Sequence, residues 1–239
     1  MNRLGGWSLE FSPGGTLTEL SFREGPSLLH RSGYEFDLGD GRIFHPQGWD
    51  ECFPTIEAHG ESGTMGRLIG QAPTLRVMNE SISQEWECRG VTARRTFSSP
   101  AEDTLLLRFQ AVNTGTASLE YLWASHALFS VHGLQRVRLA HDRVLDDFSL
   151  DQTCAKFFVA ASGPVILERE ESVVALTTDQ PFWGIWLNRG GWPAGAPAGF
   201  RCIGIEATNS DSEIPTGAVL QANETFGGWA MLKAVTKRS

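Results

Sequence analysis

The sequence predicts an all-β protein, a large antiparallel β-sandwich. Short segments that alternate apolar and polar residues follow one another closely along the chain, with glycine- and proline-rich turns between them. No window of a dozen residues shows the periodicity of an amphipathic helix. The 239 residues are enough for one large all-β domain. Because neither a linker-like change of composition nor a repeat divides the chain, we expect a single domain over residues 1–239.

The first predicted strands begin an antiparallel meander. Trp7, Leu9 and Phe11 fall on one face of an extended segment, and polar residues fall on the other. Residues 13–15, Pro-Gly-Gly, turn the chain, and residues 16–22 are expected to form the returning strand.

The middle of the chain predicts two hairpins. Segments 81–88 and 91–97 are separated only by Arg-Gly, which is typical of a tight turn. Segment 104–112 places alternate apolar residues on one face, and the run 119–123 continues the same two-residue period after Asn-Thr-Gly. We expect these last two segments to pair with each other.

The C-terminal half repeats the strand signal. A short helix or a turn is the most that residues 139–147 indicate, and residues 188–199 form a Pro/Gly-rich loop. Further strands are predicted at 165–169, 172–177, 182–187, 201–206 and 225–235.

Residues 48–63, GWDECFPTIEAHGESG, form the segment most indicative of function. They combine four carboxylates and a histidine with Trp49, Phe53 and three glycines. A core strand would not tolerate so many unpaired carboxylates, and we therefore expect a long loop laid across the scaffold. Loops that join titratable groups to aromatic walls often bind ligands. A polar loop pinned by a few apolar anchors is the alternative.

Composition excludes several classes of function. The net charge of −8, without a clustered basic stripe, argues against a nucleic-acid partner. The longest apolar runs have the length of strands, so no membrane span is expected. The N-terminus lacks an apolar run of signal-peptide length, and the four cysteines form no C-x-x-C pair. We therefore expect a cytoplasmic protein with free thiols.

Three titratable side chains stand out by their context. His59 precedes a glycine, His126 lies in the apolar run Ala-Ser-His-Ala-Leu-Phe, and Glu206 follows Cys-Ile-Gly-Ile. A buried imidazole needs a partner, and desolvation of a carboxylate makes it a better base. Any one of them alone is more often a satisfied structural group than a functional one.

Other chemistries lack their motifs. H-E-x-x-H is absent, and no two histidines have a chelating spacing on one element. The sequence has no G-x-S-x-G elbow, and residues 190–193 lack the lysine of a phosphate-binding loop. We expect neither a metal nor a cofactor.

The order of three short motifs resembles the galactose mutarotase-like (aldose 1-epimerase) superfamily. These are an early His-Gly at residue 59, a histidine at residue 126 beside an aromatic residue, and Gly-Ile-Glu ending at residue 206. Residues 192–211, WPAGAPAGFRCIGIEATNSD, carry the best match. The resemblance implies a β-sandwich with a sugar cleft on one broad face. It also implies that Glu206 is the base, that His126 is the acid, and that His59 orients or binds the sugar.

The resemblance also suggests residues that contact the sugar. Trp49, Phe53 or Trp192 would supply a flat apolar surface for a pyranose ring. The family's usual arginine is missing, since Arg42 and Arg67 do not match by motif. Asp50 and Glu51 are the expected substitutes for its polar contacts.

Two departures leave the substrate open. The aspartate that the family places between its second histidine and its glutamate could be Asp146, Asp147 or Asp179. The chain is also short for the family, so loops that close the cleft are expected to be trimmed.

Two functions follow from the resemblance. One is an isomerase of the aldose 1-epimerase (mutarotase) type that interconverts the α and β anomers of a sugar by acid/base ring opening at C1. The other is a non-catalytic carbohydrate-binding protein on the same scaffold. In either case we expect a small-molecule sugar partner and a monomer or homodimer.

Overall fold

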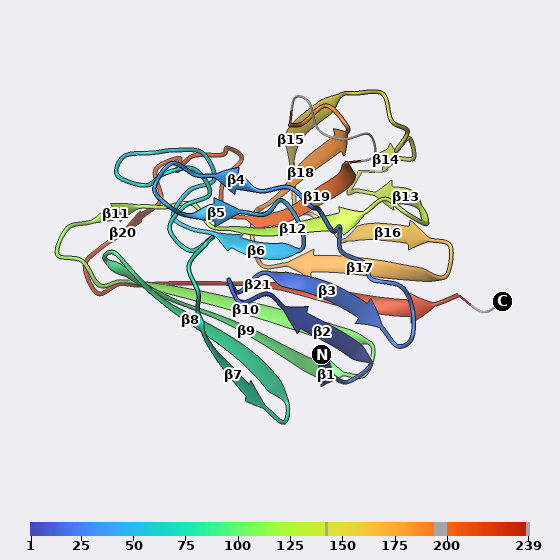
Figure 1. The fold of residues 1–239 in the computed structure, drawn as a ribbon, viewed down its shortest axis with the longest axis horizontal. Coiled ribbons are helices and arrows are strands. Elements are labelled where there is room, and N and C mark those ends of the chain that lie inside the picture. Colours follow the sequence, from blue (N-terminus) through green and yellow to red (C-terminus); the bar gives the residue numbers. More distant parts are fainter. Residues whose placement is uncertain (142, 194–199, 238–239) are drawn as a thin grey trace.

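The structure, a computed structural model, describes residues 1–141, 143–193 and 200–237. Two large antiparallel sheets are packed as layers around a shared core (Figure 1). The sheet with eight described strands consists, in spatial order, of β1 (Asn2–Leu4), β2 (Trp7–Phe11), β3 (Leu17–Phe22), β6 (Trp49–Cys52), β12 (Ala124–Ser130), β19 (Arg201–Thr208), β18 (Phe182–Arg189) and β15 (Cys154–Ala160).

The sheet with nine described strands lies against the inner face of the first. It consists, in spatial order, of β14 (Val144–Leu145), β13 (Leu134–Arg138), β16 (Val165–Arg169), β17 (Ser172–Thr178), β21 (Thr225–Thr236), β10 (Thr104–Asn113), β9 (Val91–Ala101), β8 (Ser81–Cys88) and β7 (Thr74–Met78). Two short ribbons complete the fold: β4 (Phe36–Asp37) pairs with β5 (Ile43–Phe44), and β11 (Leu119–Glu120) pairs with β20 (Val219–Leu220). The predicted all-β sandwich is confirmed.

Several predicted strands appear where the alternating pattern placed them. β2 pairs with β3, and β8 pairs with β9 across a turn whose Gly90 has a φ of 70°. Gly90 suits this position because residues with a Cβ rarely adopt positive φ. The last strand, β21, covers the predicted segment 225–235. None of the described residues forms a helix that could cross a bilayer.

The predicted hairpin between 104–112 and 119–123 is wrong. Both edges of β10 are occupied, one by β9 and the other by β21. After Asn113 the chain therefore leaves this sheet, pairs briefly as β11 with β20, and enters the other sheet as β12. Alternation identified the strands, but it contained no information about their partners.

Residues 139–147 also differ from the expectation of a short helix or turn. Val144 and Leu145 form β14, which pairs with Arg138 and Val137 of β13. The predicted loop 188–199 is described only up to residue 193; the remainder lies outside the described residues.

The predicted loop at 48–63 begins as a buried strand. Trp49–Cys52 is β6, which lies between β3 and β12 inside the eight-stranded sheet. The chain has no further regular strand until Thr74. The segments on either side of β6, about 36–47 and 53–71, fold over the outer face of the sheet, where Phe44, Ile56 and Met65 form a second, smaller apolar cluster.

The two carboxylates of β6 are tolerated because each has partners. Asp50 points to the outer face, and Thr16 donates a hydrogen bond to it at 3.2 Å. Glu51 points into the core, accepts a hydrogen bond from Trp123 Nε1 at 2.7 Å and lies 3.4 Å from Arg95 Nη1. A buried carboxylate with such partners avoids the cost of an unpaired charge.

Arg95 crosses the space between the sheets and is fully buried. Its guanidinium donates to the side chain of Gln84 and to the carbonyls of Trp49 and Gly15, in addition to its pairing with Glu51. The five donors of a guanidinium suit this convergence of oxygen atoms from separate strands.

Apolar packing supports the rest of the interior. Alternate residues of β10 are fully buried against the other sheet, as the sequence predicted: Leu105, Leu107, Phe109 and Ala111. Burial of each large side chain contributes about 1.5–3 kcal/mol. The rigid core therefore holds the outer face of the eight-stranded sheet in a fixed register, and that face supports the site.

Candidate active site

A cavity of about 480 Å³ lies over the outer face of the eight-stranded sheet. Its floor comes from β12, β15 and β18, and its walls come from the β4–β5 ribbon and the loops that cover the sheet. The described lining residues are Phe36, Asp37, Leu38, Phe44, Pro46, Ile56, Glu57, Thr64, Met65, His126, Leu128, Cys154, Lys156, Trp186, Trp192 and Glu213.

Strand register brings His126 and Glu206 together. His126 of β12 is paired directly with Glu206 of β19 on one side and with Asp50 of β6 on the other. Directly opposed residues share a face of the sheet, so all three side chains belong to the cavity side. His126 Nε2 lies 3.6 Å from Glu206 Oε1, which is close enough for electrostatic interaction but long for a hydrogen bond.

Two glycines make room for the Glu206 carboxylate. Gly184 is paired with Glu206 across β18 and β19, and a Cβ at this position would lie 3.2 Å from Glu206 Oε2. Gly204 lies two residues before Glu206, and a Cβ there would lie 3.5 Å from its Oε1. Both strand positions leave space on the face where the carboxylate lies.

Lys156 of β15 connects the buried carboxylate to the rim of the cavity. Its Nζ lies 3.1 Å and 3.0 Å from the two carboxylate oxygens of Glu206. The same nitrogen lies 2.7 Å from Glu213 Oε1. Glu206 is fully buried, Lys156 is mostly buried, and the Glu213 side chain is 35% exposed. The ammonium therefore bridges an internal carboxylate and one at the surface.

Burial and neighbouring charge set the protonation of this cluster. Burial lowers the pKa of His126, and the charge of Glu206 opposes that effect. Burial alone would also lower the pKa of Lys156, but its attraction to Glu206 and Glu213 outweighs burial and raises it. Burial raises the pKa of Asp50 to about 6, and the charge of Arg95 limits the rise. At neutral pH the lysine is therefore charged and the histidine is predominantly neutral.

Aromatic side chains form one wall of the cavity. Trp192 stacks on Phe36, with ring centroids 4.8 Å apart and planes 20° apart. Trp186 meets Trp192 edge-on at 5.4 Å. Such a wall presents flat apolar surface to the C–H face of a ring-shaped ligand. The prediction that Trp192 lies at the site is consistent with this geometry.

Four predicted substrate contacts point elsewhere or are covered. Trp49 and Phe53 are buried in the core, where Trp49 Nε1 donates to Ser125 and Phe53 packs on Phe109. Glu51 faces the same core. Asp50 lies on the cavity side but does not line the cavity. These residues belong to β6 or follow it directly. They were expected to contact the sugar because the segment was predicted to be a loop, whereas it is a strand within the sheet.

His59 does not join the other two groups. It lines a different hollow, and its Nε2 lies 2.8 Å from Glu120 Oε2 near the surface. The expected meeting of His59, His126 and Glu206 around one space is therefore wrong, because the chain carries residue 59 beyond the end of β6 and away from the sheet face. Only His126 and Glu206 converge, and His126 alone lines the cavity, because Glu206 is fully buried beside it.

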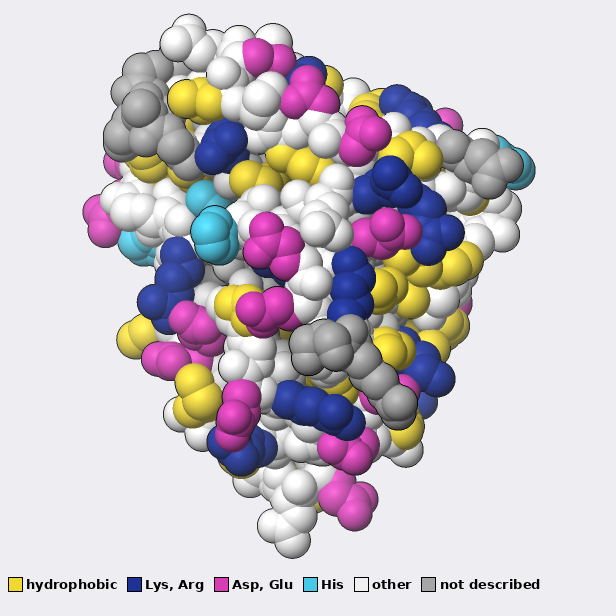
Figure 2. Space-filling view, turned by 90° about the vertical axis from the view of Figure 1, so that its right-hand side faces the viewer, with side chains coloured by type: hydrophobic (Ala, Val, Ile, Leu, Met, Phe, Trp, Pro, Cys, Tyr) yellow, Lys and Arg dark blue, Asp and Glu magenta, His cyan; other side chains and the backbone are white. Residues whose placement is uncertain are grey.

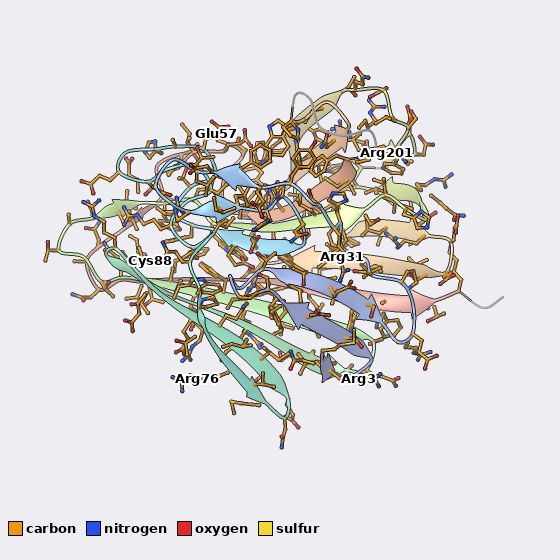
Figure 3. The ribbon with its side chains drawn as sticks, in the orientation of Figure 1. Arg3, Arg31, Glu57, Arg76, Cys88 and Arg201 are labelled. Carbon is orange, nitrogen blue, oxygen red and sulfur yellow. The ribbon has the colours of Figure 1, made fainter. Side chains whose placement is uncertain are left out.

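The alternatives for the sugar-binding aspartate and the arginine also lie outside the cavity lining. Asp147 pairs with Arg189, and Asp179 accepts a hydrogen bond from the backbone of Trp229. Arg42 is held by Asp40 and by backbone carbonyls. Figure 3 labels Glu57, which lines the cavity, in the upper part of the view, and it labels Arg3 and Arg76 in the lower part.

The residues that give the cavity its charge are not among those predicted from the sequence. They are Lys156, Glu213, Asp37 and Glu57. The run 154–160, CAKFFVA, alternates weakly and could have been identified as a strand that places Lys156 and Phe158 on one face. The other three acidic residues lie in loops or at a strand end, where periodicity gives no signal.

Metal and thiol chemistry find little support here. Within residues 1–141, 143–193 and 200–237, no three His, Cys, Asp or Glu side chains are placed to hold a metal ion. All four cysteines are free, as predicted, and burial raises the pKa of Cys52 and Cys202 above the ordinary range of a thiol.

Comparisons with known proteins give the fold. No protein-family model matches the sequence, and no curated protein matches it either. Solved structures match over nearly the whole chain. A candidate mutarotase from Salmonella typhimurium shares 11% identity at a TM-score of 0.70, covering 98% of this chain and 89% of its own. A galactose mutarotase related enzyme from Lactobacillus acidophilus shares 13% identity at a TM-score of 0.65, covering 98% and 96%. The chain has the galactose mutarotase-like fold.

A third structure agrees with this result. A galactose mutarotase-like protein from Lactobacillus casei shares 12% identity at a TM-score of 0.65, with 98% of both chains covered. The resemblance that the short motifs indicated is thus confirmed at the level of the fold. At such identities the roles of single residues rest on their own geometry.

Proposed function

We propose that this protein is an isomerase of the aldose 1-epimerase (mutarotase) type, which interconverts the α and β anomers of a free sugar. The observation that carries the proposal is the pairing of His126, which lines an aromatic-walled cavity, with the fully buried Glu206 on the neighbouring strand. The likeness of the fold to mutarotase-related structures supports the same reaction class.

The reaction needs one base and one acid on adjacent oxygen atoms. Glu206 takes the proton from the anomeric hydroxyl, the C1–O1 bond becomes a carbonyl, and the bond between C1 and the ring oxygen breaks. The ring oxygen takes a proton from His126. The carbonyl rotates, and the reverse steps close the ring on its other face. Positioned acid and base groups each contribute about 10²–10⁴ in rate.

The protonation of His126 sets the expected pH dependence. Because burial lowers its pKa, the imidazolium becomes a minor form as pH rises. Glu206, 3.6 Å away, stabilises the charged form and so maintains some of it. The acid step therefore weakens with increasing pH, and the rate is expected to decline on the alkaline side.

The shape and charge of the cavity favour an unphosphorylated monosaccharide. Its volume of about 480 Å³ falls within the range of about 300–1,000 Å³ that is typical of small-molecule pockets. Among the described lining residues Lys156 is the one lysine, no arginine is present, and Asp37, Glu57 and Glu213 are acidic. A phosphate group would meet this negative charge without an unpaired cation to bind it.

One observation favours a non-catalytic sugar-binding protein as the second candidate. Lys156 lies within hydrogen-bond distance of both Glu206 oxygens. The ammonium therefore occupies both of the oxygens that would have to accept the proton of the anomeric hydroxyl. On this alternative the same cavity would bind a sugar without turning it over.

A direct anomerisation assay separates the two. Freshly dissolved pure anomers of a panel of free aldoses are followed by polarimetry or by exchange NMR, with and without enzyme. We expect at least one sugar to equilibrate faster than in buffer, and we expect Glu206→Gln to abolish the acceleration while sugar binding persists. Binding without acceleration for every sugar would contradict the enzyme and favour the binding protein.

The matched control replaces a carboxylate outside the cavity. Asp103→Asn removes a partly exposed carboxylate that pairs with Lys233 and leaves the cavity lining unchanged. It should retain turnover. The cytoplasmic location and the monomeric or homodimeric state stay predictions from the sequence.

A further inference from the structure

We propose that Lys156 is a positioning residue for this reaction: shared between Glu206 and Glu213, its ammonium keeps the buried Glu206 carboxylate ionised and fixed toward the cavity. This inference rests on the proposed function for its catalytic meaning. The electrostatic part stands on the geometry of the three side chains alone.

The geometry is that of one cation between two anions. Lys156 Nζ lies 3.0–3.1 Å from both Glu206 oxygens and 2.7 Å from Glu213 Oε1. Three protons on the ammonium match these three acceptor atoms. Lys156 and Glu206 come from rigid strands, β15 and β19, which are separated by β18. Gly184 of β18 leaves space beside the Glu206 carboxylate.

Glu206 depends on this ammonium because the surrounding groups cannot replace it. From β12 it faces His126, whose pKa burial lowers, and from β6 the nearest titratable groups are the Cys52 thiol and Asp50. β18 contributes Gly184, which has no side chain. Without Lys156 the carboxylate would be a fully buried charge next to a predominantly neutral imidazole, and such a charge is strongly disfavoured.

Glu213 makes the arrangement adjustable. It lies on the loop after β19, and its backbone carbonyl accepts hydrogen bonds from the amides of Ile56 and Glu57, so the loop is tied to the cavity wall. As a second anion on the same ammonium, it weakens the hold of Lys156 on Glu206. When a sugar hydroxyl takes one oxygen of Glu206, the lysine can remain paired with Glu213.

This role differs from simple structural support. A buried ion pair adds little net stability compared with apolar packing, whereas a positive charge within about 4–6 Å shifts the protonation of a carboxylate by about 1–3 pH units. The decisive measurement is therefore the pH at which Glu206 takes up its proton.

The experiment follows the carboxyl signal of Glu206 by 13C NMR in protein labelled at the glutamate side-chain carboxyl, with Glu206→Gln used to assign the signal. The titration is repeated for Lys156→Met, Lys156→Arg and Glu213→Gln. Lys233→Met is the matched control, because Lys233 pairs with Asp103 on an exposed part of β21.

The variants have expected shifts of opposite sign. Lys156→Met should move the Glu206 titration midpoint to higher pH by at least about one unit. Lys156→Arg should move it less than Lys156→Met does, since the positive charge is retained. Glu213→Gln should move it to lower pH, because a competing negative charge is lost. Lys233→Met should change nothing.

Two results would overturn the inference. One is an unchanged midpoint in Lys156→Met; the other is an unchanged or raised midpoint in Glu213→Gln. If Lys156→Met does not fold, Glu213→Gln alone decides, since it alters a partly exposed side chain. The measurement needs no turnover, so it distinguishes a failure of this inference from a failure of the proposed function.

An activity arm then tests the catalytic meaning. In an active wild type, the acid limb of the pH–rate profile should move with the NMR midpoint in each variant, and Lys156→Arg should restore the wild-type profile. A wild type that accelerates no sugar would contradict the proposed function and leave the NMR result decisive for Lys156. If wild type is active and the acid limb of the pH–rate profile is the same in Lys156→Met, the positioning role is contradicted.

Discussion

Replacing Glu51 by glutamine should make the stability of the sandwich less dependent on pH. Burial raises the pKa of Glu51 to about 7 from its ordinary value of 4.5, against the opposing effects of Arg95 and Trp123. Below pH 4.5 the carboxyl is protonated in both the folded and the unfolded chain. As pH rises, the unfolded chain releases this proton first, so the folded state loses stability until about pH 7.

The magnitude follows from the size of that rise. One pKa unit corresponds to about 1.4 kcal/mol, so a rise from 4.5 to about 7 corresponds to about 3 kcal/mol. The stability of wild type relative to Glu51→Gln should therefore fall by about 3 kcal/mol between pH 4.5 and pH 7.5. Glutamine can still accept the hydrogen bond from Trp123 Nε1, so the change chiefly removes the titrating group.

Urea unfolding at several pH values, followed by tryptophan fluorescence, gives the measurement. Subtracting the free energy of unfolding of the variant from that of wild type at each pH removes the contributions of other titrating groups. One of these is His30, whose pKa burial lowers to about 4. A difference that stays constant or increases between pH 4.5 and 7.5 would refute the assignment. Asp103→Asn, at a partly exposed carboxylate, is the control and should show no such fall.

Further predictions concern the cavity. His126→Ala should lower the anomerisation rate by about 10²–10⁴, whereas His59→Ala should leave it unchanged because His59 lies in another hollow; equal losses in a rate assay would contradict this. Trp192→Ala should raise KM more than it lowers kcat, since it removes a stacking wall; an effect confined to kcat would argue otherwise. Gly184→Ala should impair turnover and reduce the free energy of unfolding by about 1–3 kcal/mol, because its Cβ would press on Glu206 and Phe158. Full activity would contradict this, since it would mean that the Glu206 carboxylate can move away from the added methyl group.

The sequence predicted the fold class because the alternating pattern is local. Strands such as 104–113 bury every second residue, and that period is visible without a structure. Pairing is a non-local property, so the partner of β10 could not be read in the same way. The prediction of a loop at residues 49–52 was wrong for a different reason. The carboxylates of β6 are paired with Arg95, Trp123 and Thr16, which lie in distant segments of the chain.

Part of the candidate site could be predicted from the sequence. His126 and Glu206 were recognised because each lies within an apolar run that forms a strand, and strand register then makes them neighbours. Lys156 gave no such signal, since a single lysine in a weakly alternating segment is typical of a solvated face. His59 matched the expected His-Gly motif, but the chain places it in a different hollow, beside Glu120. Local context identified candidate groups, but only tertiary structure could select among them.

The lack of a nucleic-acid partner stays a prediction from the sequence. On the face that Figure 2 shows, basic and acidic side chains are interspersed rather than gathered by sign. On that face, such a mixture of charges produces no extended positive potential.

The strand β6 also constrains which insertions and deletions the chain can accept. Its consecutive acids serve opposite sides of one sheet, Asp50 toward His126 and Glu51 toward Arg95. Adding or removing a single residue between Gly48 and Asp50 would exchange these sides and leave Arg95 without its anion. Homologues are therefore expected to show no insertions or deletions within Trp49–Cys52 and to vary in length in the loop that follows it. An alignment of the family could be anchored on this strand.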